Sequence, residues 1–323
     1  MGATDVVGVG LIGHGKAGKI FHEPLIRATD GLELKRIARR ADAGALIDDE
    51  SIELVVVATP NTSHFDLARQ ALLARKHVVV DKPFTITSAE AAELIAVARN
   101  EERLLTVFHN RRWEGDFLTV RRLIDQNAFG RLLHYEARFD RFRNEARPGA
   151  WRETPEPGSG VLYDLGSHLI DQVLLLFGEP ERITADVRRE RDFARTDDAF
   201  DIWMHYPRMK VTLTAGMLIR EKTPRYVVRG TKATFIKYGL DPQEADLAAG
   251  RSPRDSGWGR EPREQWGTLI SDNGERTIET LPGNYRAFYE NVRDVLAGRA
   301  ESAVTAEQAK RTIEVIEEIR PRD

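Results

Sequence analysis

His77-Val78-Val79-Val80-Asp81-Lys82-Pro83-Phe84 is the stretch that decides the fold of this chain. Its three consecutive valines predict a short strand that is buried on both faces. Pro83 has no N–H to donate, so the pairing ends directly after Asp81 and Lys82. A lysine at the carboxyl end of a buried strand lies where open α/β sheets bind ligands, and its neighbours can tune its pKa. A surface lysine beside a turn proline is the alternative interpretation.

A glycine-rich motif near the start of the chain strengthens the first interpretation. Residues 6–12 predict a strand, and Gly13-His14-Gly15-Lys16-Ala17-Gly18 follows as a G-x-G-x-x-G. A helical stretch with Pro24 as a kink comes next. Between a first strand and a first helix, this motif predicts a dinucleotide-binding loop whose backbone and helix N-terminus hold the pyrophosphate. A plain β–α turn is the alternative.

The end of the second expected strand, residues 32–38, bears on the choice of cofactor. An NAD site usually carries an acidic residue there, for the ribose 2′-OH. This chain has Arg39-Arg40 instead. Two guanidinium groups suit a 2′-phosphate, so the sequence favours NADP over NAD. Two solvated surface arginines are the alternative interpretation.

The next span is unusually short. Only 13 residues, Ala41 to Glu53, separate Arg40 from the strand expected over residues 54–58. A βαβ crossover alone takes at least ~10–12 residues, so a helix, another strand and their turns do not fit. We expect a bare loop or a break here. Either the nucleotide domain is trimmed, or residues are missing from the sequence.

The remainder of the first third continues the alternation of strands and helices. Thr59-Pro60-Asn61 follows the strand over 54–58 at the sheet edge of the glycine loop, so it can contact the cofactor. A helix is expected over 63–75. Thr87 and Glu90 form a possible capping box for a helix through residue 98, and residues 104–108 predict a further strand. This order predicts a parallel, doubly wound sheet.

Beyond about residue 110 the pattern changes. Several strand-like segments follow one another with short turns, which predicts a mostly antiparallel sheet. They cover residues 132–143, 182–190, 199–206, 210–217, 225–230 and 233–237. Thr305 and Gln308 predict the cap of a final helix. The chain of 323 residues therefore divides into a Rossmann domain over 1–109 and an α+β domain over 110–323.

A second informative stretch is Gly158-Ser159-Gly160-Val161-Leu162-Tyr163-Asp164-Leu165-Gly166-Ser167-His168-Leu169-Ile170-Asp171. It predicts a helix from Asp164 onward, with Asp164 and His168 on one face. A histidine can take a proton near neutral pH, and a carboxylate one turn away can orient a substrate hydroxyl. A capping aspartate and a packed histidine are the alternative. A metal site would need a third ligand, so no metal is expected.

The composition narrows the class of protein. With 48 basic and 51 acidic residues the net charge is -3, so neither nucleic acid nor a membrane surface is an expected partner. The chain has no cysteine, which excludes disulfides and thiolate catalysis. No signal peptide or membrane span is recognisable, so a cytoplasmic protein is expected.

Together these motifs resemble the glucose–fructose oxidoreductase/inositol dehydrogenase/MocA family, Gfo/Idh/MocA for short. The resemblance rests on the glycine motif, Ala58-Thr59-Pro60-Asn61, Asp81-Lys82-Pro83 (Glu-Lys-Pro in most of the family) and Asp164-x-x-x-His168. Within the family the chain is similar to NADP-dependent scyllo-inositol dehydrogenases, notably in residues 109–113, 163–168 and 235–239. The resemblance departs between Arg40 and Leu54, at the adenosine end of the cofactor site.

The resemblance implies the roles of individual residues. Lys82, Asp164 and His168 would be catalytic, and Arg152 and Tyr163 would join them in binding substrate. His168 would take the proton from the carbinol, Lys82 would hold the oxygen, and Asp164 would orient the polyol. The implied cofactor-binding residues are Gly13, His14, Gly15, Lys16, Ala17, Gly18, Arg39, Arg40, Thr59, Pro60, Asn61, His64, Asp81, Lys82, Pro83, Asn110 and Arg111.

Three functions remain open. The first is an NADP-dependent dehydrogenase of a scyllo-inositol-like polyol or sugar, with NAD as a possible cofactor. The second is a reductase of another sugar carbonyl, such as an anhydro-sugar or an aldose. The third is a protein that senses NADP(H) without turnover. The family resemblance also implies a homodimer or homotetramer formed through the sheet of the second domain.

Overall fold

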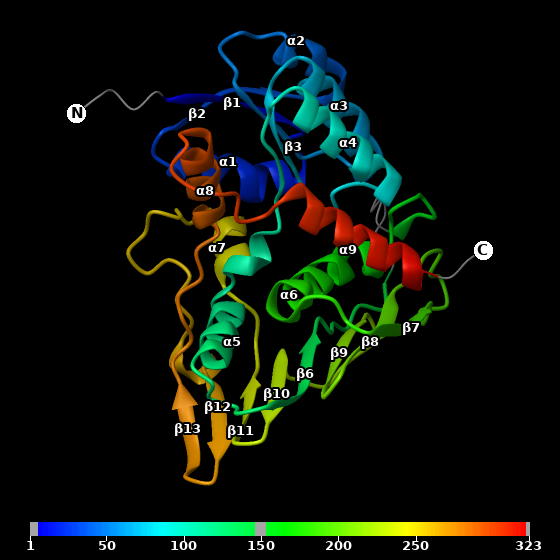
Figure 1. The fold of residues 1–323 in the computed structure, drawn as a ribbon, viewed down its shortest axis with the longest axis vertical. Coiled ribbons are helices and arrows are strands. Elements are labelled where there is room, and N and C mark those ends of the chain that lie inside the picture. Colours follow the sequence, from blue (N-terminus) through cyan, green and yellow to red (C-terminus); the bar gives the residue numbers. More distant parts are fainter. Residues whose placement is uncertain (1–5, 146–152, 321–323) are drawn as a thin grey trace. The chain divides into compact units, whose positions relative to one another are not determined.

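The structure is a computed structural model, and it describes residues 6–145 and 153–320. The chain forms two compact units, drawn together in Figure 1. The first unit consists of residues 1–113, 243–258 and 284–314, and the second of 114–242, 259–283 and 315–323. Two later segments, residues 243–258 and 284–314, thus belong to the same unit as the N-terminal residues, and neither unit is continuous in sequence. The division into domains at residue 109 stays a prediction.

The first unit is built on a five-stranded sheet of order β2-β1-β3-β4-β5, in which every pair is parallel. Its strands are β1 (Val7–Ile12), β2 (Leu32–Ala38), β3 (Leu54–Val57), β4 (His77–Val80) and β5 (Leu105–Val107). The register aligns the strand ends: Ile12 lies opposite Ala38 and Val57, and Val57 lies opposite Val80. The loops that follow these strands therefore share one edge of the sheet. The expected Rossmann-type fold is confirmed.

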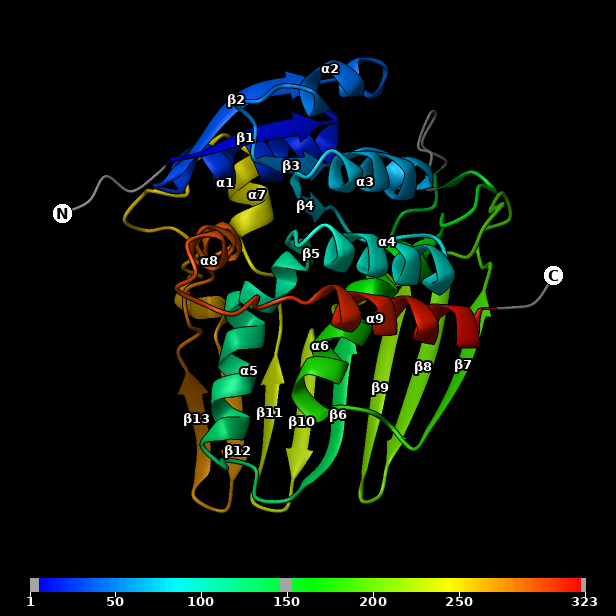
Figure 2. The same cartoon turned by 45° about the horizontal axis from the view of Figure 1, so that its top comes forward.

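Helices complete the first unit. They are α1 (Glu23–Ala28), α2 (Ala43–Ile47), α3 (His64–Leu73), α4 (Ser88–Asn100), α7 (Gln243–Ala248) and α8 (Arg286–Leu296), with the greater part of α9 (Ala306–Ile319). Thr87 and Glu90 make the expected capping box at the start of α4. Pro24 lies in the first turn of α1, which continues directly from a π-helical turn, η1 (Gly18–His22). Figure 2 shows α3 and α4 side by side.

The short span after β2 is not a bare loop, so the prediction of a bare loop was wrong. Its residues form a 3-10 turn, η2 (Arg40–Asp42), and then α2. Leu46 and Ile52 are buried against the sheet, and a side chain added at Gly10 would lie 2.5 Å from Leu46. No strand stands between β2 and β3 in the chain, so β2 forms the edge of the sheet. The two alternatives, a trimmed domain and missing residues, stay predictions.

The second unit contains an eight-stranded sheet of order β13-β12-β11-β10-β6-β9-β8-β7. Only the pair β6–β9 is parallel, so the expected mostly antiparallel sheet is confirmed. Its strands are β6 (Leu132–Arg138), β7 (Arg182–Arg188), β8 (Ala199–Tyr206), β9 (Met209–Gly216), β10 (Tyr226–Gly230), β11 (Ala233–Lys237), β12 (Gly267–Ser271) and β13 (Gly274–Ile278). The sequence reasoning missed β12 and β13.

Two helices of the second unit pack on this sheet, α5 (Gly115–Asp125) and α6 (Ser167–Phe177). Tyr135 and Ala137 of β6 are buried, whereas His134, Glu136 and Arg138, which alternate with them, are only half-buried. This alternation gives the sheet one apolar and one polar face. Thr305 and Gln308 exchange the two expected capping hydrogen bonds before α9. Among the described residues, no helix is long and apolar enough to span a membrane.

Candidate active site

The glycine loop after β1 has the geometry that a dinucleotide requires. Gly13 has φ +101°, and a Cβ there would lie 2.3 Å from the Ala58 carbonyl oxygen. A Cβ at Gly18 would lie 2.2 Å from the Gly13 carbonyl oxygen, so these two glycines are needed for the turn and for close packing. Gly15 differs, because it is exposed and no atom lies within 4 Å of a Cβ built on it. This open position is where a pyrophosphate can approach the backbone.

Arg39 and Arg40 lie beside this loop. The Gly13 N–H donates a 2.9 Å hydrogen bond to the carbonyl oxygen of Ala38, the last residue of β2. Both arginines follow directly, and both are exposed. The carboxyl end of β2 is the position that reads the adenosine ribose in this fold. Their contact with a 2′-phosphate stays a prediction.

His64 joins two of the expected cofactor loops. Its imidazole is buried, with Nδ1 2.9 Å from the Pro83 carbonyl oxygen and Nε2 2.9 Å from the Thr59 carbonyl oxygen. Burial lowers the pKa of His64, although the charge of Asp81 raises it. The neutral ring can donate to only one carbonyl at a time. His64 therefore positions the loops after β3 and β4, and its direct contact with the cofactor stays a prediction.

Asp81, next to Lys82, is the centre of a buried polar cluster. Its Oδ1 accepts a 2.9 Å hydrogen bond from the Lys82 N–H and lies 3.6 Å from Nε2 of His22. Nδ1 of His22 is 2.6 Å from the Tyr289 hydroxyl. One tautomer suits both contacts: Nε2–H faces the carboxylate, and the Tyr289 O–H donates to Nδ1. The cluster therefore fixes the backbone that carries Lys82.

The charge state of this cluster follows from its contacts. Burial alone would raise the pKa of Asp81, but His22, His64 and Lys82 together hold it below its ordinary value of 3.8. Burial raises the pKa of Tyr289 well above 10.0, and the Asp81 charge raises it further. Asp81 is thus an ionised carboxylate beside Lys82 at neutral pH. The sequence reasoning placed Asp81 but missed His22 and Tyr289.

Lys16 and Arg111, both predicted to bind cofactor, contact the same acid. Glu244, in α7, has Oε1 3.1 Å from Lys16 Nζ and Oε2 3.0 Å from an Arg111 terminal nitrogen. Nε2 of His14 lies 2.7 Å from Glu23 Oε2 at the start of α1. Asn110 is buried in the 3-10 turn η4 (Asn110–Trp113). The sequence reasoning missed Glu244, although Gln243 and Glu244 stand together between two turn-forming segments.

In the second unit, Asp164 and His168 lie on one helical segment. Asp164 belongs to a π-helical turn, η6 (Leu162–Gly166), and His168 belongs to the first turn of α6. Hydrogen bonds in a π-turn span five residues, so four residues complete a little less than one turn. Asp164 is half-buried, and His168 is buried. Tyr163 is also buried, which raises its pKa. Arg152 lies outside the described residues.

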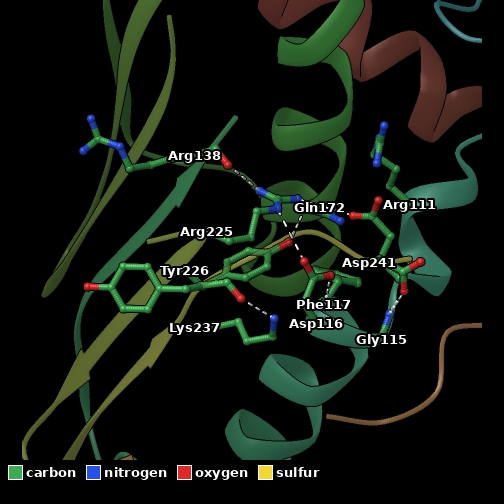
Figure 3. Close-up of polar contacts among 12 residues, drawn as sticks. Arg111, Gly115, Asp116, Phe117, Arg138, Gln172, Arg225, Tyr226, Lys237 and Asp241 are labelled. Carbon is green, nitrogen blue, oxygen red and sulfur yellow. Dashed lines mark hydrogen bonds and ion pairs between the residues drawn. The ribbon is translucent and has the colours of Figure 1, made fainter. Parts of the chain in front are cut away.

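A buried polar network holds α6 to the sheet, and Figure 3 shows part of it. Gln172, one turn after His168, accepts a 3.0 Å hydrogen bond from the Tyr226 hydroxyl. The Arg225 guanidinium lies over the Tyr226 ring at 4.4 Å and is 3.5 Å from Asp116 Oδ2. Buried charges of this kind require partners, and here α5 and β10 supply them. The network therefore fixes the rotation of the helix that carries His168.

The structure thus assembles the predicted residues in two groups. Lys82 has Asp81, His22 and the glycine loop in its own unit. Asp164 and His168 share a helical segment of the other unit. The convergence of all three on one substrate stays a prediction.

Comparison with known proteins gives the family. Two sequence profiles of one oxidoreductase family match the chain. The profile of the family's NAD-binding Rossmann fold matches residues 40–109, and the profile of its C-terminal alpha/beta domain matches residues 121–320. The chain belongs to the Gfo/Idh/MocA oxidoreductase family. It is an NAD(P)-dependent dehydrogenase of that family, as the sequence predicted.

Three similar proteins illustrate how far the likeness extends. The uncharacterised oxidoreductase YdgJ of Escherichia coli (strain K12) is 43% identical over 97% of this chain and 95% of its own length. IolW of Bacillus subtilis (strain 168), a scyllo-inositol 2-dehydrogenase (NADP(+)), is 36% identical over 97% of this chain and 93% of its own. A solved structure from Yersinia pestis superposes with a TM-score of 0.92 at 42% identity, covering 97% of this chain and 93% of that one. The Gfo/Idh/MocA fold therefore extends over nearly the whole chain.

Proposed function

We propose that this Gfo/Idh/MocA member uses NADP and transfers a hydride between the nicotinamide and a cyclic polyol or sugar of the scyllo-inositol type. The observation that supports NADP is the position of Arg39 and Arg40, which follow a strand end hydrogen-bonded to the glycine loop. The name of one relative, IolW, supports the substrate class. A substrate of this kind offers a secondary carbinol for oxidation.

The proposal assigns a role to each polar side chain. The bound cofactor supplies the hydride acceptor. His168 takes the proton from the carbinol, Lys82 holds its oxygen, and Asp164 orients the neighbouring hydroxyl groups. Asp81 keeps a negative charge beside Lys82, because the pKa of its buried carboxyl is held below its ordinary value. Tyr163 and Arg152 are the further candidates for substrate binding. The polar face of the eight-stranded sheet is the surface for a homodimer or homotetramer.

The experiment is a panel of inositols, anhydro-sugars and aldoses, assayed with NADP+ and NAD+, and in the reverse direction with the corresponding ketones. Formation of reduced nicotinamide with an inositol and NADP+ is the expected result. If only another sugar carbonyl is turned over, the protein is a reductase of that carbonyl and not a polyol dehydrogenase. Cofactor binding without any turnover would favour a sensor of NADP(H) over an enzyme of this specificity.

A double change, Arg39→Ala with Arg40→Ala, tests the choice of cofactor. Each lost charge-assisted contact to phosphate costs about 1.5–3 kcal/mol, or roughly 10- to 100-fold in affinity per arginine. Calorimetry should show this loss for NADP and almost none for NAD. Arg36→Ala is the matched control, because Arg36 is an exposed arginine within the same strand, β2. Equal losses for both cofactors would refute the preference for NADP.

A further inference from the structure

Glu244 is a carboxylate at a place where an anion is expected to bind. It comes from α7, which contacts η1, the helical turn immediately after the glycine loop. Figure 2 shows α7 beside α1. The two oxygens of Glu244 contact Lys16 at 3.1 Å and Arg111 at 3.0 Å. Lys16 directly follows Gly15, the open position of the loop. One acid thus occupies two of the cations that a diphosphate at this loop would attract.

The position of α7 does not depend on this acid. Gln243, the preceding residue, is completely buried and is hydrogen-bonded within the first unit. Its Oε1 accepts from the Trp258 indole N–H at 3.0 Å and from the Tyr285 N–H at 2.6 Å, and its Nε2 donates to the Trp113 carbonyl at 3.2 Å. Changing the charge of Glu244 therefore leaves α7 in place.

Two opposing effects of Glu244 on the cofactor can be weighed. As a bridge it orders Lys16, but the Lys16 side chain is 66% exposed, and ion pairs of exposed side chains contribute little. As a charge it repels the diphosphate and competes for both cations, at a partly buried site where Arg111 is only 11% exposed. The charge effect is the larger one. Glu244 should therefore weaken cofactor binding.

We infer that Glu244 is a built-in counter-charge that competes with the cofactor's diphosphate for Lys16 and Arg111 and so accelerates cofactor release. A dehydrogenase must exchange its nicotinamide cofactor in every turnover, and release of product is a frequent limit on the rate. The inference rests on the diphosphate binding at the glycine loop. It does not rest on the proposed preference for NADP or on the polyol.

The test is Glu244→Gln, which keeps the shape of the side chain and removes its charge. NADPH should bind about tenfold more tightly, measured by its fluorescence, and its release in stopped flow should slow by a similar factor. ADP, which carries a diphosphate and no nicotinamide, should gain affinity in the same direction. Higher salt should reduce the gain. Thermal unfolding without cofactor serves as the measure of folding.

Two further variants make the result specific. Glu93→Gln is the matched control, since Glu93 is an exposed acid of the same unit that pairs with Arg69; NADPH affinity should not change. In a Lys16→Gln background, Glu244→Gln should lose part of its gain, because one of the released cations is absent.

The outcomes separate this inference from the proposed function. Unchanged or weaker NADPH and ADP binding by folded Glu244→Gln would overturn the counter-charge, even if the polyol panel succeeds. An equal gain with Glu93→Gln would also overturn it, because the effect would then be one of net charge. Tighter binding with Glu244→Gln would uphold it, even if no polyol is turned over. A wild-type protein that binds neither NADPH nor ADP would refute both.

Discussion

Gly15→Ala should separate cofactor binding from folding. A methyl group at Gly15 meets no atom within 4 Å, and the backbone there does not have a positive φ. The unfolding free energy should therefore change little, or rise by about 0.4–1 kcal/mol because alanine restricts the unfolded chain. The same methyl group would stand where we expect the pyrophosphate to approach. Losing a charge-assisted contact there costs about 1.5–3 kcal/mol, or roughly 10- to 100-fold in affinity.

The neighbouring glycines give the opposite result. Gly18→Ala places a Cβ 2.2 Å from a backbone oxygen, which cannot move aside as a flexible side chain would. Gly13→Ala adds a left-handed conformation, at about 1–2 kcal/mol, to an overlap of the same kind. Both variants should lose stability by about 1–3 kcal/mol or more.

Two measurements on each variant are sufficient: urea unfolding and titration with NADPH. Gly257→Ala is the control, because Gly257 is an exposed glycine of the same unit with only the tip of Arg251 near its Cβ; it should change neither quantity by much. A Gly15→Ala protein that binds NADPH like the wild type would refute the placement of the diphosphate. One that unfolds easily would refute the geometry of the loop.

Two further predictions concern the polar residues. Since Asp81 has a folded-state pKa below its ordinary 3.8, its contribution to stability is present above about pH 4 and is lost as the pH falls through the folded value. Asp81→Asn should therefore remove part of the loss of stability in acid, and urea unfolding between pH 3 and 7 should show the two curves converge, whereas parallel curves would contradict the prediction. His168→Ala should lower turnover by ~10²–10⁴, and a Lys82→Ala/His168→Ala double change by little more than the worse single one. If His168 is only a packed residue, steady-state kinetics per folded molecule will stay near the wild-type value while the melting temperature falls.

The local parts of the fold could be predicted from the sequence because their signals are local. The valines of β4, the glycine motif and the Thr87–Glu90 capping box depend on neighbours within a few residues. The span after Arg40 could not be predicted in the same way. Counting residues correctly excluded a further strand but missed α2, because five residues are enough for a short helix that buries Leu46 and Ile47. Packing against the sheet, rather than intrinsic propensity, stabilises so short a helix.

The candidate site was predictable only as far as its motifs extended. Asp81 and Lys82 were identified because they end a strand. The partners of Asp81 were not, because Tyr289 lies 267 residues from His22 and no periodic pattern connects them. The buried contacts of Arg225 and Gln172 could not be predicted either, because their partners are also distant in sequence. The partners of a buried charge are recognisable in a sequence only when they stand at a regular spacing from it.

Buried packing and hydrogen bonds explain why residues 243–258 and 284–314 belong to the first unit. His22 and Phe108 are buried, with their ring centroids 4.4 Å apart, and Phe108 also meets Phe288 at 5.0 Å. The Thr106 hydroxyl donates to the Val304 carbonyl at 2.6 Å, at the end of the sheet's last strand. Without the later segments, the rings of His22 and Phe108 and the Thr106 hydroxyl would be exposed, and His22 would lose its hydrogen bond with Tyr289. The later segments therefore complete both the core of this unit and the surroundings of Lys82.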